Sequence, residues 1–198
     1  MGSEPRVGVL ALQGDVDEHC AMLEACGARP VRVKTGPELQ SVDGLIVPGG
    51  ESTTVIRLLD RFELTEPLVA RVRAGMPLWG TCMGMIVVAR DVAGMDQKTL
   101  GLLDVTVRRN AFGRQLASEE VALEVPALGG ASFPAVFIRA PWIERSGPGV
   151  EVLAAYKGHG VFVRQGHVMG TSFHPELTGD RRVHAWFLEM LATAKRAA

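Results

Sequence analysis

Short apolar runs alternate with amphipathic segments along the first 90 residues, and this alternation constrains the fold more than any other feature of the sequence. The predicted strands are 6–14, 29–35, 43–50 and 76–80. The segments that follow them place apolar residues on one helical face. The predicted helices are 15–27, 51–62, 66–75 and 83–90. Because strands joined through helices pair in parallel by right-handed crossovers, this order predicts an α/β fold with a parallel sheet covered on both faces.

The rhythm changes near residue 100, where strand-like runs follow one another with short turns. These runs are 102–110, 120–126, 134–141, 150–158, 159–167 and 168–176. They predict antiparallel additions to the same sheet, or strands folded over one end of it. Segment 178–196 carries one apolar face and predicts a terminal helix. Because no linker or repeat interrupts the chain, we predict a single domain over residues 1–198.

The composition is that of a folded protein without a large charge imbalance. Hydrophobic residues make up 47%, charged residues 22%, and the formal net charge is −1. Without a basic run, we expect no binding to nucleic acid or to acidic membrane surfaces. No apolar run approaches the roughly 20 residues that span a bilayer. The three cysteines form no CxxC pair, which argues against a zinc site and favours a reducing, cytoplasmic location.

Cys82 stands between Gly80 and Gly84 in "WGTCMGM", where a predicted strand meets a predicted helix. Sites in open α/β sheets lie at the carboxyl ends of strands. A nucleophile on a tight strand-to-helix turn needs small residues two positions to either side. The start of the helix favours a thiolate, and the N–H group of Met83 is placed to donate to an oxyanion. The alternative is an unreactive buried cysteine, and this pentapeptide alone leaves both open.

His174 is the strongest candidate for a partner base among the five histidines. It ends a strand-like run in "SFHPE", where Pro175 stops a central strand or a helix from continuing. Since residues two apart in an extended segment point the same way, His174 and Glu176 can face one site, with the carboxylate orienting the imidazole. A surface turn without a role is the alternative. His19 and His184 lie within predicted helices, and we expect both at the surface.

The glycine pair in "VPGGEST" predicts a loop of backbone donors. Gly49 and Gly50 let the main chain approach a ligand closely, and the Gly50 N–H group is a candidate second oxyanion donor. An ordinary tight turn is the alternative. Arg109 and Arg139 lie in predicted loops, where a guanidinium suits the carboxylate of an amino acid. Because most arginines are solvated at the surface, the residues alone support these two only weakly.

Several segments together resemble one known family. They are "LALQGDVDEH", "IVPGGEST", "WGTCMGM", "RNAFGRQ", "FIRAP" and "SFHPEL". The chain resembles the triad glutamine amidotransferases, and among them the PdxT/SNO family of glutaminase subunits of pyridoxal 5′-phosphate synthase. The resemblance extends over residues 6–192. The GxCxG and HPE segments mark the superfamily, whereas "PGGEST", "RNAFGRQ" and "FIRAP" are specific to this subfamily.

The resemblance implies a fold, a set of site residues and an activity. The implied fold is a three-layer αβα, flavodoxin-like sheet, mostly parallel, with antiparallel additions in the C-terminal half. The implied triad is Cys82, His174 and Glu176. The implied glutamine-binding residues are Gly49, Gly50, Glu51, Arg109, Ile138 and Arg139. Met83 departs from the alanine that the family often carries, which leaves the backbone donor in place.

The implied reaction hydrolyses L-glutamine to L-glutamate and ammonia through a thioester on Cys82. It requires no cofactor and no metal. The implied partner is a (β/α)₈-barrel synthase subunit that uses the ammonia to build pyridoxal 5′-phosphate. Three alternatives remain open from the sequence. The same chemistry could serve another synthase, such as the histidine-pathway or anthranilate one. The fold could instead carry a non-catalytic binding module, or a cysteine hydrolase or peptidase.

Overall fold

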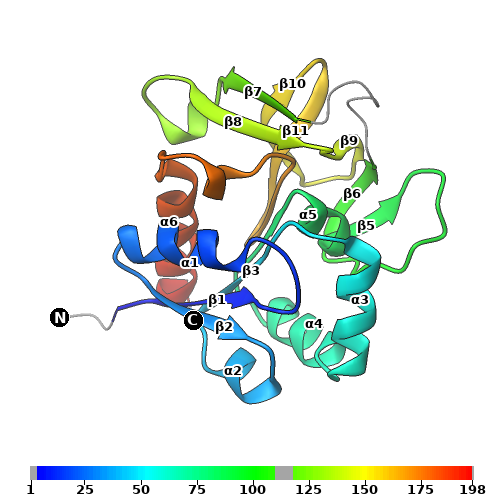
Figure 1. Ribbon diagram of the computed structural model, residues 1–198, viewed down its shortest axis with the longest axis vertical. Coiled ribbons are helices and arrows are strands. Elements are labelled where there is room, and N and C mark those ends of the chain that lie inside the picture. Colours follow the sequence, from blue (N-terminus) through cyan, green and yellow to red (C-terminus); the bar gives the residue numbers. More distant parts are fainter. Residues whose placement is uncertain (1–3, 110–117, 198) are drawn as a thin grey trace.

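The computed structural model describes residues 4–109 and 118–197, and within them a curled sheet is flanked by helices (Figure 1). The strands are β1 Arg6–Leu10, β2 Arg29–Val33, β3 Gly44–Val47, β4 Leu78–Thr81, β5 Ala89–Val92, β6 Leu103–Arg108, β7 Ser118–Leu123, β8 Phe133–Ile138, β9 Trp142–Ser146, β10 Glu151–Tyr156, β11 His159–Gln165 and β12 Val168–Thr171. The helices are α1 Val16–Ala25, α2 Gly36–Gln40, α3 Ser52–Arg61, α4 Thr65–Arg73, α5 Met83–Val88 and α6 Arg182–Ala197. Short 3₁₀ turns cover Pro126–Leu128 and Pro175–Leu177.

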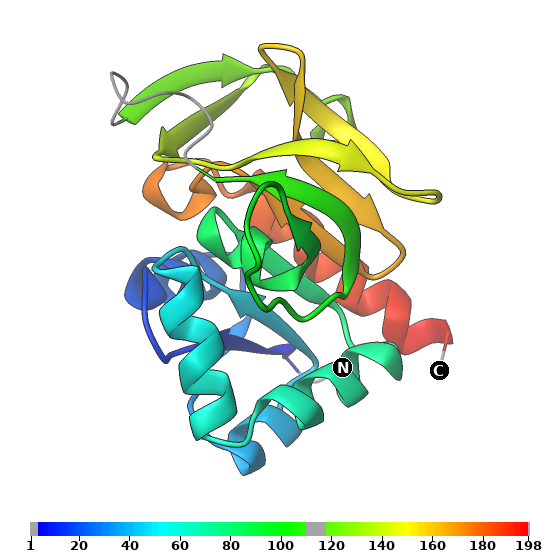
Figure 2. The same ribbon diagram turned by 90° about the vertical axis from the view of Figure 1, so that its right-hand side faces the viewer.

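The main sheet has the strand order β2-β1-β3-β4-β12-β11-β9-β6-β5, with β10 paired to β11. The half from β2 to β12 is parallel throughout. The other half is antiparallel except for the β5–β6 pair. Strands β7 and β8 form a separate two-stranded sheet, which lies over one end of the molecule (Figure 1, Figure 2). The predicted α/β class, with a mostly parallel sheet and antiparallel additions, is confirmed.

Strand β12 departs from the expectation for the C-terminal half. Its run was expected among the antiparallel additions, but it pairs in parallel with β4 and completes the parallel half. The physical reason is the tight turn at Gly166, which reverses the chain between β11 and β12. This reversal aligns β12 with β4, so the segment after β12 emerges beside Cys82 at the same edge of the sheet.

Three elements were not expected from the sequence: α2, β5 and β9. Helix α2 is only five residues long, and the Glu38 carboxylate accepts hydrogen bonds from the N–H groups of Lys34 and Thr35 just before it. The helix predicted over 83–90 ends at Val88, and the chain continues directly into β5. These elements are too short for apolar periodicity to reveal them.

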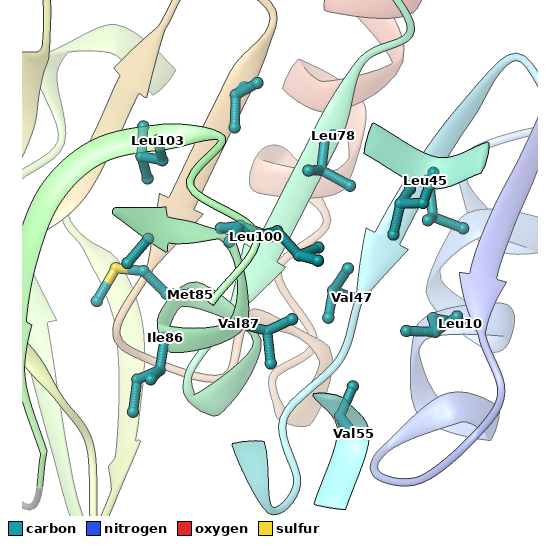
Figure 3. Packing of buried hydrophobic residues seen from close by; sticks show 14 of the residues in the cluster. Leu10, Leu45, Val47, Val55, Leu78, Met85, Ile86, Val87, Leu100 and Leu103 are labelled. Atoms are coloured by element: carbon teal, nitrogen blue, oxygen red, sulfur yellow. The ribbon is translucent and has the colours of Figure 1, made fainter. Parts of the chain in front are cut away.

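The core lies on both faces of the parallel strands, because successive side chains of a strand point to opposite faces. In β3, Leu45 and Val47 pack toward α3 and α5, whereas Ile46 packs toward α1 and α6. In β4, Leu78 and Trp79 divide in the same way. Figure 3 shows the cluster on the face toward α3 and α5, which includes Leu45, Val47 and Leu78. Burial on both faces explains why these strands read as continuous apolar runs. Among the described residues, no helix combines the length and apolar character needed to cross a bilayer.

Candidate active site

A cavity of about 300 Å³ lies beyond the carboxyl ends of the central parallel strands. Cys82, after β4, and His174, after β12, both line it. The wall is completed by loops that follow β1 and β3 and by the end of β8. Because the carboxyl ends of parallel strands meet at one edge, residues far apart in the sequence converge here. The cavity therefore holds the cysteine and the histidine singled out from the sequence.

Cys82 occupies a strained turn between β4 and α5. Its backbone angles are φ 49° and ψ −113°, a conformation that residues other than glycine rarely adopt. The flanking glycines make this turn possible. A Cβ atom at Gly80 would lie 2.5 Å from the carbonyl oxygen of Gly84, and one at Gly84 would overlap the carbonyl oxygen of Val47. The turn leaves the Cys82 thiol at the cavity wall, with Sγ 3.7 Å from the carbonyl oxygen of Ile138.

Replacing Gly84 with alanine is expected to lower the free energy of unfolding by about 1–3 kcal/mol, because the added methyl group overlaps backbone rather than a flexible side chain. At this chain length the loss corresponds to a drop in Tm of about 3–10 °C, measurable by thermal unfolding followed by circular dichroism. Gly36→Ala is the matched control, since a Cβ atom there meets nothing within 4 Å. Equal Tm values for the two variants would contradict this reading of the turn.

His174 and Glu176 form a buried hydrogen-bonded pair. Nδ1 of His174 lies 2.7 Å from Oε1 of Glu176, and each residue is only 5% exposed. Oδ2 of Asp15 approaches the same nitrogen at 3.4 Å. The pairing was expected from an extended segment, and that reason was wrong. Glu176 belongs to the 3₁₀ turn Pro175–Leu177, whose first residues fold the carboxylate back onto the imidazole.

The electrostatics of this pair favour a protonated, oriented imidazole. Burial lowers the pKa of His174, but its hydrogen bonds with Asp15, Cys82 and Glu176 outweigh burial and raise the pKa above the ordinary value. Burial raises the pKa of Glu176, and the hydrogen bond to His174 opposes that rise. An imidazole held between a thiol and carboxylates can take a proton from the thiol and keep it as part of an ion pair.

The glycine loop after β3 is held in place from two sides. The Gly49 N–H group donates to Oγ1 of Thr81 at 3.1 Å, and the Glu51 N–H group donates to Oε1 of Gln13 at 2.8 Å. Gly50, between them, lines the cavity. A Cβ atom at Gly49 would lie 2.6 Å from Cε1 of His174, so only glycine lets the loop pass this close to the imidazole.

The predicted binding residues reach the cavity in different ways. Glu51, Ile138 and Arg139 line it directly. Arg109 does not, because its guanidinium is bound to Oε1 of Glu51 at 3.0 Å and to Oε1 of Gln97 at 3.0 Å. Hydrogen bonds from Thr53 and Arg109 outweigh the effect of burial on Glu51 and lower its pKa. The rest of the "RNAFGRQ" segment, residues 110–115, lies outside the described residues.

The sequence profile of the SNO glutamine amidotransferase family matches residues 9–193. The chain belongs to this family. It is 57% identical over 194 residues to "Pyridoxal 5'-phosphate synthase subunit PdxT" of Frankia casuarinae, covering 97% of this chain and 98% of the relative. A protein of the same name from Mycobacteroides abscessus is 56% identical over 189 residues, covering 94% and 97%.

Solved structures agree with this membership. A crystal structure of a glutamine amidotransferase superposes with a TM-score of 0.89 at 48% sequence identity, covering 94% of this chain and 98% of that one. A chain in the structure of PurLQS from Thermotoga maritima superposes with a TM-score of 0.62 at 17% identity, over 98% of each chain. The second likeness shows the fold alone. The predicted family resemblance is therefore confirmed, and the roles of individual site residues stay predictions.

Sequence reasoning missed four residues around this site. Gln13 and Asp15 line the cavity; their position just after a buried strand was a usable signal, since sites gather there. His19 and His184, expected at the surface, are both 0% exposed, so that expectation was wrong. Each sits on the helix face turned toward the sheet. A single histidine in an amphipathic helix does not show in the sequence on which face it lies.

Asp15, His174 and Glu176 carry the types of atom that bind metals. Their ligand atoms lie within 4.8 Å of one another among the described residues. The hydrogen bond between His174 and Glu176 already explains why these two side chains lie close together without a metal between them. The expectation that the site uses no metal stays a prediction.

Proposed function

We propose that this chain is the glutaminase subunit of a pyridoxal 5′-phosphate synthase, acting as a single domain. The observation that carries the proposal is that Cys82, on its strained turn, shares a cavity with His174, which is hydrogen-bonded to the buried Glu176 carboxylate. Family membership and relatives named as PdxT subunits, at 57% and 56% identity, support the assignment to this synthase. In this assignment Cys82 is the nucleophile, His174 the acid and base, and Glu176 the orienting carboxylate.

The proposed reaction proceeds in two steps. The Cys82 thiolate attacks the side-chain carbonyl carbon of glutamine, and a C–S bond forms while the carbonyl oxygen takes the negative charge. Collapse of this intermediate breaks the C–N bond, and His174 gives a proton to the departing ammonia. His174 then takes a proton from water, which attacks the γ-glutamyl thioester. Glutamate leaves, and the thiolate is restored.

The oxyanion is assigned to two backbone donors, the N–H groups of Gly50 and Met83. Both residues line the cavity, and Met83 is the first residue of α5. Preorganised N–H groups at the position of developing charge are among the largest contributions to such reactions. We propose that docking of the partner sets the final geometry of the Gly49–Gly50 peptide, so that turnover is faster in the complex than in the free subunit.

Recognition of the amino-acid end of glutamine is assigned to opposite charges on the cavity wall. Glu51 suits the α-ammonium group, and Arg139 suits the α-carboxylate as a planar fork of donors. Both line the cavity. Arg109 orients Glu51 through the 3.0 Å ion pair. Because the pKa of Glu51 is lowered, this pair is fully formed above the ordinary pKa of a glutamate and is lost only as the pH falls through the lowered value.

Arg109→Gln is expected to raise the KM for glutamine about fivefold with little change in kcat, since an ion pair of this exposure is worth about 1 kcal/mol. Arg108→Gln is the matched control, because the neighbouring Arg108 pairs with Glu144, and neither residue lines the cavity. Steady-state ammonia release gives both constants. A fall in kcat with an unchanged KM, or an equal effect of Arg108→Gln, would contradict this role.

The proposed partner is a (β/α)₈-barrel synthase subunit that receives the ammonia. The test measures ammonia release from glutamine with and without that subunit, and pyridoxal 5′-phosphate formation with glutamine as the nitrogen source. Added ammonium salt is the control, because it bypasses this chain. We expect glutamine-dependent formation of the product only when both subunits are present. Ammonia release without product formation would favour the alternative of another synthase, and no ammonia release would favour a non-catalytic binding module.

A further inference from the structure

A chain of buried polar side chains runs behind the proposed triad. His184 on α6, His19 on α1 and Thr81 at the end of β4 are each 0% exposed. Nε2 of His184 lies 3.0 Å from Nδ1 of His19. Nε2 of His19 lies 3.2 Å from Oγ1 of Thr81 and 3.4 Å from Oε2 of Glu176. The His19 ring therefore stands between the terminal helix and two groups of the proposed site.

Both histidines are neutral in this setting. Burial lowers the pKa of His19 well below the ordinary value, and the nearby imidazoles of His184 and His174 lower it further, because a proton on any one of them disfavours a proton on His19. Burial lowers the pKa of His184 to about 3. Trp79 closes the pocket, with its ring edge-on to His19 and His184 at centroid distances of 5.6 and 4.8 Å. A neutral imidazole has one N–H donor and one bare acceptor nitrogen, so the position of each proton matters.

Two proton arrangements satisfy the contact between the histidines, and the surroundings favour one. If His19 donates from Nδ1, its bare Nε2 can accept from the Thr81 hydroxyl but also faces the Glu176 carboxylate, and the Nδ1–H group of His184 is buried without an acceptor among the described residues. If His184 donates from Nε2, His19 carries its proton on Nε2, directed at Thr81 and Glu176. A bare nitrogen of His184 is then left unpaired. This costs less than the first arrangement, which leaves a buried N–H donor of His184 unpaired and turns a lone pair of His19 toward a carboxylate.

We propose that His19 is a positioning residue for the glutaminase reaction assigned above, with its tautomer set by His184. Its Nε2–H group is shared between Oγ1 of Thr81 and Oε2 of Glu176. Thr81 in turn accepts the Gly49 N–H group at 3.1 Å. One imidazole thus fixes both the orienting carboxylate of the triad and the start of the glycine loop. The inference rests on the proposed function.

The two oxygens of Glu176 explain why this contact matters. Oε1 is bound by His174 at 2.7 Å, whereas Oε2 is buried without a hydrogen bond from the described residues, and the Nε2 atom of His19 lies 3.4 Å from it. The groups that face this carboxylate are His174, His19 and the carboxylate of Asp15. Without the donor on His19, the second oxygen faces an apolar interior and a like charge, so the carboxylate holds a proton more readily.

The test compares His19→Leu, which removes the donor, with His19→Gln, whose amide N–H group can reach the position of Nε2. We expect His19→Leu to lower kcat about 10- to 100-fold, by analogy with the loss of hydrogen-bond partners that orient metal ligands in other enzymes, with the KM for glutamine changed less than about twofold. Because the lost donor stabilised the charged carboxylate, the pKa of Glu176 rises, and the acid limb of the kcat/KM profile moves to higher pH. His19→Gln is expected to restore most of the kcat and to return the acid limb of the profile close to its wild-type position.

A second comparison separates positioning from packing. In a Glu176→Gln background, His19→Leu is expected to add little further loss, because the two residues act together. Three results would overturn the proposal. The fold losses of the two single variants could multiply in the double variant, the acid limb could stay in place in His19→Leu, or His19→Gln could fail to restore activity. Circular dichroism and Tm identify any variant that fails to fold.

Nitrogen-15 NMR of the wild-type protein tests the tautomers without any activity. We expect His19 and His184 as neutral Nε2–H forms at neutral pH. An Nδ1–H form of His19 overturns the inference even if the enzyme is active. Absence of wild-type ammonia release in the presence of the synthase subunit would instead remove the proposed function.

Discussion

Cys82→Ala is expected to abolish glutamine hydrolysis. Loss of the nucleophile removes the thioester path altogether, and the expected fall in kcat is on the order of 10⁴-fold or more. Ammonia release in the presence of the synthase subunit measures it. Cys82→Ser is less informative, because a hydroxyl group can leave residual chemistry.

Cys26→Ala is the matched control for this experiment. Cys26 is half-buried at the end of α1, does not line the cavity, and its pKa is raised by burial, which makes it a poor nucleophile. We expect this variant to keep the wild-type rate. Equal ammonia release from wild type and Cys82→Ala would contradict the assignment of the nucleophile.

His174→Asn is expected to lower kcat by about 10²- to 10⁴-fold, the usual contribution of a positioned acid and base. The amide can fill the space at the cavity wall but cannot carry a proton between thiol, ammonia and water. Wild type is expected to lose activity as the pH falls through the range where the Glu176 carboxylate becomes protonated, whereas the residual activity of the variant lacks that dependence. Steady-state assays over a pH series measure both effects.

His159→Asn serves as the control for the histidine. His159 stacks on Trp142 with ring centroids 3.7 Å apart and does not line the cavity. We expect its kcat to match that of wild type. An active His174→Asn variant with the wild-type pH profile would show that another group is the base.

The parallel half of the sheet was predictable because both of its faces are buried. Strands such as β3, whose side chains pack on two sides, appear in the sequence as unbroken apolar runs that end in glycine. The parallel pairing of β12 was not predictable from its own residues. It depends on where the chain returns after β11, and the apolar pattern of a short strand does not specify its neighbour.

The residues of the proposed triad were predictable from local chemistry. Cys82, with a glycine two positions to either side, and His174, two residues before Glu176, follow from steric and acid–base needs within a few positions. The reason given for the pairing of His174 with Glu176 was wrong, because a 3₁₀ turn rather than an extended strand brings the Glu176 carboxylate to the imidazole. Steric rules identified the residues but not the backbone path between them.

The supporting residues were not predictable, because their roles exist only in three dimensions. His19 and His184 are 165 positions apart, yet their side chains meet at 3.0 Å. Each looks like an ordinary polar residue on a helix, and no local pattern reveals that both face the sheet. Arg109 likewise contacts Glu51 and does not line the cavity, a distinction that no sequence motif carries.

Detection of the covalent intermediate tests directly whether Cys82 is the nucleophile. Wild-type protein turning over glutamine with the synthase subunit is quenched in acid, digested and examined by mass spectrometry for a γ-glutamyl thioester. We expect the adduct on the peptide that contains Cys82, and none on the peptides that contain Cys20 or Cys26. An adduct on either of those cysteines, or steady ammonia release with no adduct on Cys82 in wild type, would contradict it.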